Sequence, residues 1–123
     1  MNKLSNFGVL AGMVAVVFAL SATEVLAIGP YGAIAFNRGT MHFGDSWNQD
    51  TPAQAEALAL GACNEDGCRI VVQVAYSCGA IAADSSGFGI GNARSRREAD
   101  AEAIAQCGSG GCRILASDCS PMN

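Results

Sequence analysis

Apolar and polar residues alternate most clearly over 69–76, which reads RIVVQVAY. One face of this segment would carry its apolar side chains, Ile70, Val72, Val74 and Tyr76. This period of two predicts a half-buried β-strand. A shorter and more polar counterpart, RILAS at 113–117, predicts a second strand of the same kind.

Further strands are predicted by two copies of Gly-Ala-Ile-Ala, at 32–35 and 79–82. The segments around Phe43 and Phe88, each followed by a glycine, have the same character. Glycine in these short segments indicates turns or a close approach of the backbone to another element.

Two helices are predicted to begin at hydroxyl residues. Thr51 is followed by Gln54, and Ser95 by Glu98, which is the spacing of a capping box. The next residues, AQAEALALGA at 53–62 and ADAEAIAQ at 99–106, are rich in helix-forming alanine and leucine. In the first run the helical period predicts a buried face, formed by Ala55, Leu58, Ala59 and Ala62.

The same landmarks occur twice in the same order, which indicates an internal repeat. Each copy contains Gly-Ala-Ile-Ala, Phe-Gly, a helix N-cap and Cys-x4-Cys-Arg-Ile. We predict a single α+β domain over residues 28–123, made of two β-β-α-β repeats at about 31–77 and 78–120. The simplest arrangement is one shared antiparallel sheet with both helices packed on one face.

Residues 1–27 predict a secretory signal peptide. Lys3 provides a basic start, Phe7 to Leu20 an uncharged apolar core, and Val25-Leu26-Ala27 a cleavage site before Ile28. A retained membrane anchor is the alternative, but a span needs about 20 apolar residues and this core is shorter. We therefore expect a secreted or periplasmic protein without stable membrane insertion after cleavage.

All six cysteines lie after residue 27, and an even number in a short exported chain predicts disulfides. The repeat favours the set Cys63–Cys68, Cys107–Cys112 and Cys78–Cys119. We expect the last of these, which closes the longest loop, to tie the two halves together. A zinc site with four thiolates from the two Cys-x4-Cys pairs, and redox catalysis, are the alternatives.

The net charge of the chain is −4, and 7% of its residues are aromatic. This balance argues against nucleic acid as a partner, because nucleic-acid binding rests on basic side chains that neutralise phosphates. It argues equally against anionic membrane surfaces. We predict no cofactor and no bound metal ion.

Residues that could support catalysis are few. His42 is the only histidine, so a small hydrolase would have to combine it with a nearby carboxylate. The carboxylates at 65–66 and 98–102 are expected to form solvated surface. We therefore predict no catalytic residues and no enzymatic activity.

Four residues are candidates for binding a partner. Arg94, Arg96 and Arg97 cluster where the second helix begins, whereas the first copy has Asp50 and no arginine there. Such a cluster suits an acidic partner or an anion, and a solvated helix start is the alternative. Trp47 is the fourth candidate, because exposed aromatic side chains often anchor interfaces, with burial in the core as its alternative.

One ordered set of motifs extends over nearly the whole chain after residue 27: Tyr31-Gly-Ala-Ile-Ala, Cys68-Arg-Ile-Val-Val, Cys78-Gly-Ala-Ile-Ala and Cys112-Arg-Ile. In these motifs the chain resembles the bacterial domain-of-unknown-function 4189 family. The resemblance implies small, exported, cysteine-rich proteins without an established enzymatic activity, some of them regarded as host-facing. It supplies no catalytic residues.

From these features we predict a non-catalytic, disulfide-stabilised binding domain whose partner is a protein or a component of the cell envelope. A narrower alternative is a periplasmic inhibitor or immunity protein that blocks a toxin or hydrolase by surface complementarity. A small hydrolase that uses His42 is the third hypothesis.

Overall fold

A computed structural model describes residues 28–121, so the predicted signal peptide lies outside the described residues. Strand–strand–helix–strand is the order of elements over 31–75 and again over 77–120. The elements are β1 (Tyr31–Phe36), β2 (Phe43–Gln49), α2 (Pro52–Cys63), β3 (Arg69–Ala75), β4 (Ser77–Asp84), β5 (Gly87–Ala93), α3 (Arg96–Cys107) and β6 (Arg113–Ser120). Within 28–121, no helix is long and apolar enough to cross a membrane.

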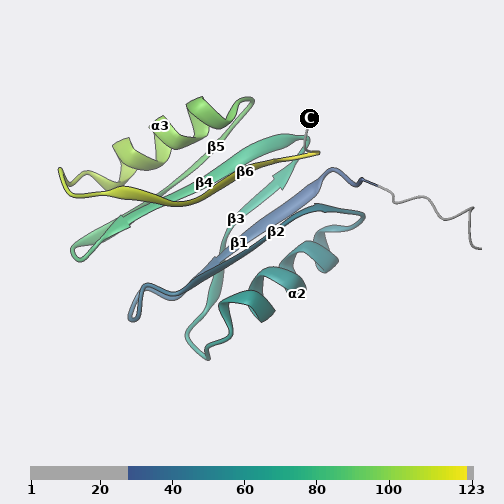
Figure 1. Ribbon diagram of the computed structural model, residues 1–123, viewed down its shortest axis with the longest axis horizontal. Coiled ribbons are helices and arrows are strands. Elements are labelled where there is room, and N and C mark those ends of the chain that lie inside the picture. The colour runs from purple at the N-terminus through teal and green to yellow at the C-terminus, as the bar shows by residue number, and fades with distance from the viewer. Residues whose placement is uncertain (1–27, 122–123) are drawn as a thin grey trace, which may run out of the picture.

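The strands form two three-stranded antiparallel sheets, with the orders β2-β1-β3 and β5-β4-β6. The prediction of one shared sheet is therefore wrong. The inner faces of the two sheets meet in a core of Ile34, Phe36, Val72, Val74, Ile81, Ala83 and Ala116. Helix α2 covers the outer face of the first sheet and α3 the outer face of the second, so the helices lie on opposite sides of the molecule (Figure 1).

The two central strands explain why two sheets form instead of one. In β1, Ile34 belongs to the core between the sheets, whereas Ala33 and Ala35 pack against α2. In β4, Ile81 and Ala80 are divided in the same way between the core and α3. Because both faces of each central strand are apolar, each needs a cover on both sides, and the opposite sheet covers the isoleucine side.

Both helices begin where the sequence predicts. The hydroxyl oxygens of Thr51 and Ser95 accept hydrogen bonds from the backbone N–H groups of Gln54 and Glu98, each at 3.1 Å. Both cap residues have extended backbone angles, as expected for an N-cap. The helix starts therefore agree with the capping pattern in the sequence.

The buried face of α2 is narrower than its apolar pattern predicts. Ala55, Ala59 and Cys63 are buried, but the side chain of Leu58 is 52% exposed and Ala62 is also exposed. The helix lies so close to the strands that only one row of small side chains, spaced by four residues, fits between them. The assignment of Leu58 and Ala62 to the buried face is therefore wrong.

One extra residue in β3 divides its apolar side chains between two faces. Ile34 pairs with Val72 and Ala35 with Ile70, so Val71 has no partner on β1. Ile70 consequently packs toward α2, whereas Val72 lies in the core between the sheets. The single face expected from the alternation is thus wrong at this end of the strand.

The final strand is longer than the sequence predicts. β6 extends over Arg113–Ser120 instead of 113–117, and it pairs along β4, where Ser77 faces Ser120 and Cys78 faces Cys119. Pairing with the buried central strand maintains β6 beyond its apolar residues.

The three disulfides are Cys63–Cys68, Cys107–Cys112 and Cys78–Cys119. The first two join the end of a helix to the start of the next strand. Cys78 and Cys119 face each other on neighbouring strands of the second sheet. This bond therefore lies within one half, and the expectation that it ties the two halves together is wrong.

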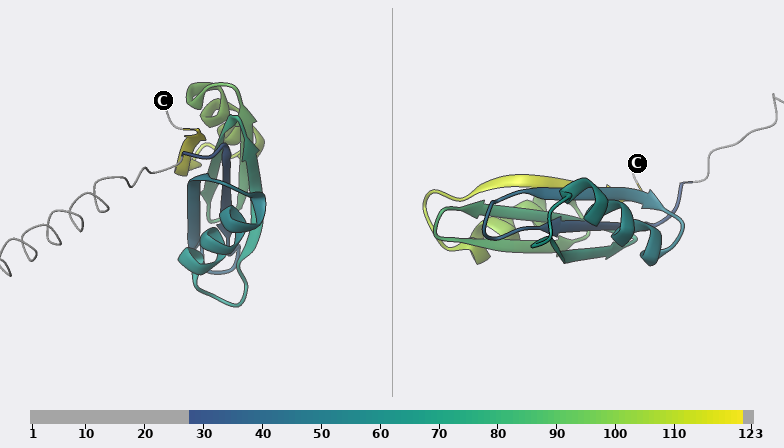
Figure 2. Two further views of the ribbon diagram at one scale, coloured as in Figure 1. Left: turned by 90° about the vertical axis from the view of Figure 1, so that its right-hand side faces the viewer. Right: turned by 90° about the horizontal axis from the view of Figure 1, so that it is seen from below.

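The two halves are joined by packing and hydrogen bonds. The rings of Phe36 and Phe88 lie 5.1 Å apart between centroids, and the backbone N–H of Asn48 donates to the hydroxyl of Ser120 at 2.9 Å. The first and last described residues lie at the same end of the molecule (Figure 1 and the right panel of Figure 2). The link from β3 to β4 is at this end too, where Tyr76 N–H donates to Pro30 C=O at 3.0 Å.

Candidate functional site

A hollow of about 430 Å³ lies beside the link between β3 and β4. Segments that are distant in sequence form it: the β3–β4 link, the start of β4, the start of α3 and the end of β6. Its lining includes Tyr76, Arg94, Arg96, the Cys78–Cys119 disulfide and Pro121. The hollow is thus lined by two arginines and a tyrosine.

The arginines that line this hollow form no ion pair with a carboxylate of the described residues. Among residues 28–121, no arginine lies within ion-pair distance of a carboxylate. The ion pair found in this part of the chain joins His42 and Glu65. Arg96 is held by its Nε, which donates to the hydroxyl of Ser117 at 3.1 Å. Two guanidinium groups in one hollow suit a carboxylate, phosphate or sulfate group, which they can contact through paired N–H donors.

The four candidate binding residues do not form one site. Arg94 and Arg96 line the hollow, but Arg97, although exposed, is not among the lining residues. Trp47 lies in β2, half-buried against the core between the sheets. Its indole Nε1 donates to a carboxylate oxygen of Asp45 at 2.9 Å, which fixes the ring in place.

Tyr76 is the residue of this site that the sequence did not single out. The alternating pattern placed it on the buried face of β3, but its side chain is 76% exposed. Its backbone has φ 54°, a left-handed conformation that is uncommon for an aromatic residue. The short link between the two sheets requires this turn, and the residue types around Tyr76 do not predict it.

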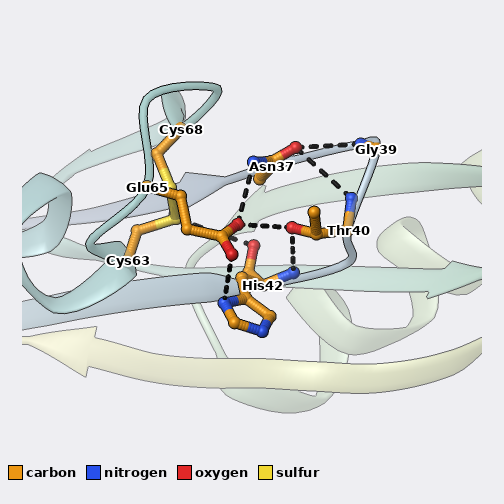
Figure 3. The surroundings of a disulfide bond; sticks show 7 residues. All are labelled: Asn37, Gly39, Thr40, His42, Cys63, Glu65 and Cys68. Carbon is orange, nitrogen blue, oxygen red and sulfur yellow. Dashed lines mark hydrogen bonds and ion pairs between the residues drawn. A yellow bond between two sulfur atoms is a disulfide. The ribbon is translucent and has the colours of Figure 1, made fainter.

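His42 belongs to a polar network at the turn between β1 and β2 (Figure 3). Its Nδ1 lies 2.9 Å from Oε2 of Glu65. The other carboxylate oxygen of Glu65 accepts from the amide of Asn37 at 2.9 Å and from the hydroxyl of Thr40. Glu65 lies in the loop that Cys63–Cys68 closes, so the network holds this loop against the turn.

The geometry of this network differs from that of a hydrolytic triad. In a triad the hydroxyl of the nucleophile hydrogen-bonds the imidazole, and the carboxylate orients the ring from its other side. Here the hydroxyl of Thr40 donates to Glu65 and accepts from the backbone N–H of His42 at 3.4 Å. The described residues contain no free cysteine as another nucleophile. This arrangement favours a structural role for His42.

The two Cys-x4-Cys pairs cannot share a zinc ion. Cys63–Cys68 lies with α2 on one outer face of the molecule, and Cys107–Cys112 with α3 on the opposite one. Asp84 has a carboxylate oxygen within 4.8 Å of both sulfurs of the second pair. Because these sulfurs are joined in a disulfide, they are not thiolate ligands.

Asp84 instead fastens the β4–β5 turn to the second disulfide loop. The hydroxyl of Ser109, together with the hydroxyl and backbone N–H of Ser86, lowers the pKa of Asp84 from 3.8 to about 2. A carboxyl group whose pKa is depressed by folding stabilises the native state above the pKa of the unfolded chain, about 4, and loses this effect as the pH falls through the folded value.

We therefore predict that thermal stability decreases between about pH 4 and about pH 2 in part because Asp84 becomes protonated. In Asp84→Asn this part of the pH dependence should disappear. Ser109→Ala removes the largest cause of the lowered pKa of Asp84. In this variant the loss of thermal stability should therefore occur at higher pH. Melting temperatures measured across this range check both variants, and unchanged profiles would contradict the assignment.

Comparison with known proteins gives a consistent result. The family model described as "Domain of unknown function (DUF4189)" matches residues 31–119. The uncharacterized protein Rv1813c of Mycobacterium tuberculosis is 39% identical over 69 residues, which are 56% of this chain and 47% of that protein. Protein Rv1269c of the same organism is 38% identical over 58 residues, 47% of this chain and 45% of that protein. These matches span about half the length of the relatives.

The fold also has a counterpart among solved structures. The NMR structure of Rv1813c from Mycobacterium tuberculosis superimposes with a TM-score of 0.59 at 31% sequence identity. The superposition covers 80% of this chain and 81% of that chain. The similarity therefore includes most of the described residues.

Proposed function

Because this chain belongs to the DUF4189 family, a domain family of unknown function, we propose a role from the geometry of its own surface. In this role the protein is an exported, disulfide-stabilised, non-catalytic binding domain. Its hollow at Arg94 and Arg96 receives an acidic group of a protein or of a cell-envelope component. The three disulfides support a location outside the reducing cytoplasm.

The observation that carries this proposal is that Arg94 and Arg96 line one hollow and that neither forms an ion pair with a carboxylate of residues 28–121. Unlike the charges of a uniformly solvated helix start, these two lie in a concave surface beside an exposed aromatic ring, that of Tyr76. Arginine and tyrosine are the residue types enriched where protein partners bind most tightly. The hollow therefore supports recognition of an anionic group.

The non-catalytic part of the proposal is supported by the way the polar residues are used. Glu65 and His42 hold a loop against a turn, and Glu98 accepts a hydrogen bond from the cap residue Ser95 at 2.8 Å. Glu102 accepts from the backbone of β5. We also retain the internal repeat as an interpretation, because corresponding positions in the two halves make similar contacts.

We predict that the double variant Arg94→Glu/Arg96→Glu binds its partner on the order of tenfold more weakly than the wild type, because charge reversal repels an acidic group. The wild-type domain, immobilised with its disulfides intact, is used to capture proteins from an envelope extract. The affinity of the main captured protein is then measured for each variant at two salt concentrations.

Arg97→Glu is the matched control, because Arg97 is a neighbouring arginine outside the hollow. It should retain most of the affinity. An equal effect of Arg97→Glu, or no effect of the double variant, would refute the hollow as the binding site. A captured toxin or hydrolase would support the narrower alternative, in which the domain is a periplasmic inhibitor or immunity protein.

A further inference from the structure

The two sheets differ in whether side chains of the neighbouring helix form hydrogen bonds with an edge strand. β2 and β5 are the edge strands nearest in sequence to α2 and α3, respectively. On β5, the backbone N–H of Ile90 donates to the side chain of Gln106 at 2.7 Å, and that of Asn92 to Glu102 at 3.1 Å. Two side chains of α3 thus occupy the hydrogen-bonding groups of this edge, which protects it from pairing with another strand.

The helix beside β2 has no such side chains. The backbone of Ala62 lies over Gly44 of β2 as that of Gln106 lies over Gly89 of β5. Ala62 therefore stands where α3 has Gln106, and Leu58, one turn earlier, stands where α3 has Glu102. Neither alanine nor leucine can accept a hydrogen bond from a strand edge.

The β2 edge presents backbone groups that β1 does not use. Asn37 N–H donates to His42 C=O at 2.8 Å, which starts the ladder, and Phe43 and Asp45 face Phe36 and Ile34. In an antiparallel ladder every second pair directs its N–H and C=O groups away from the partner strand. By this alternation, the backbone N–H and C=O groups of Phe43 and Asp45 point away from β1. No side chain of residues 28–121 accepts a hydrogen bond from these two N–H groups.

An apolar and acidic surface surrounds this open edge. Leu58, on the flank of α2 that faces β2, is 52% exposed, and Phe43 in β2 itself is 38% exposed. From Phe43 to Cys63 the chain contains no basic residue, while Asp45 lies in the strand and Asp50 follows it. An added strand would meet the exposed Leu58 on the helix side and the negative charges of Asp45 and Asp50.

We propose that β2 binds an extended, basic segment of a partner protein, which adds as a fourth strand to the first sheet. Asp45 and Asp50 complement lysine or arginine side chains in that segment, and Leu58 and Phe43 complement an apolar centre. A second copy of this chain is disfavoured, because antiparallel pairing of two β2 strands would bring Asp45 of each close to the other. This surface is separate from the hollow of the proposed function.

Random peptides of about twelve residues, displayed on phage, provide the probe. They are selected on the oxidised wild-type domain and counter-selected on Leu58→Glu/Ala62→Gln, which recreates the capping side chains of α3. We expect the enriched peptides to alternate in apolar residues and to carry basic ones. Synthesised, they should bind the variant about tenfold more weakly, and methylation of alternate backbone nitrogens should abolish binding.

Hydrogen exchange locates the bound peptide, since the amides of Phe43 and Asp45 should exchange more slowly in the complex. In the control Glu102→Leu/Gln106→Ala, the amides of Ile90 and Asn92 should exchange faster while peptide binding to β2 is unchanged. The Arg94→Glu/Arg96→Glu variant should also bind these peptides normally, which separates this inference from the proposed function.

Three results would overturn the proposal. The first is the absence of enriched peptides, and the second is equal binding by the wild type and Leu58→Glu/Ala62→Gln. The third is a wild-type dimer, detected by light scattering, that this variant abolishes, because the occupant of the edge would then be a second copy. Circular dichroism and intact mass establish that the variants are folded and oxidised.

Discussion

Replacing Cys78 and Cys119 together by alanine is expected to lower the free energy of unfolding by about 4 kcal/mol. The bond joins residues with a sequence separation of 41, whereas each of the other two disulfides has a separation of 5. The entropy lost by the unfolded chain grows with loop length, so removal of a short disulfide should cost about 2 kcal/mol. Urea unfolding of the oxidised proteins measures both losses.

The position of this disulfide adds a second expectation. Because Cys78 and Cys119 lie on β4 and β6 of one sheet, their replacement should first accelerate amide exchange in the second half of the chain. The strands of the first sheet should change less. Cys107→Ala/Cys112→Ala is the control, since it removes a short disulfide from the same half. Equal losses in the two variants would contradict the loop-length argument.

Features set by neighbouring residues were predictable from the sequence. The helix starts at Thr51 and Ser95 follow from a hydroxyl three residues before Gln54 or Glu98. The short disulfides follow from the repeated Cys-x4-Cys spacing, and the remaining two cysteines are joined as the repeat favoured. Each of these features depends on a few residues that are close together in the chain.

The number of sheets was not predicted, although the sequence contained a signal for it. Both Gly-Ala-Ile-Ala segments are apolar at every position, which is typical of strands covered on both faces. The alternation over 69–76 suggested a half-exposed sheet instead, and the extra residue at Val71 concealed how its side chains divide. Which strands share a sheet depends on contacts between distant segments.

The candidate site was predictable only in part. Arg94 and Arg96 stood out as a cluster next to a helix start, but the hollow exists because β6 and the β3–β4 link reach the same place. Tyr76 enters it through a left-handed backbone conformation. Leu58 was expected to be buried and is exposed, because the small residues beneath α2 bring the helix backbone close to the sheet.

The close approach of helix and strand leads to the second large effect, which we expect from Gly89→Ala. A Cβ at this position would lie 2.3 Å from both Ala103 O and Cys107 N, which are backbone atoms of α3. Backbone of a helix held by a disulfide cannot move aside as a flexible side chain would. Overpacking of this kind should lower the free energy of unfolding by about 3 kcal/mol, measured by urea unfolding.

Gly87→Ala is the matched control, because Gly87 lies two residues earlier in β5 and a Cβ there meets nothing within 4 Å. Its effect should be below about 1 kcal/mol. If Gly89→Ala is as mild as this control, α3 does not lie against β5 as described, and the hydrogen bonds from Ile90 and Asn92 to this helix become doubtful too. A large difference between the two variants would support the close packing of α3 against β5.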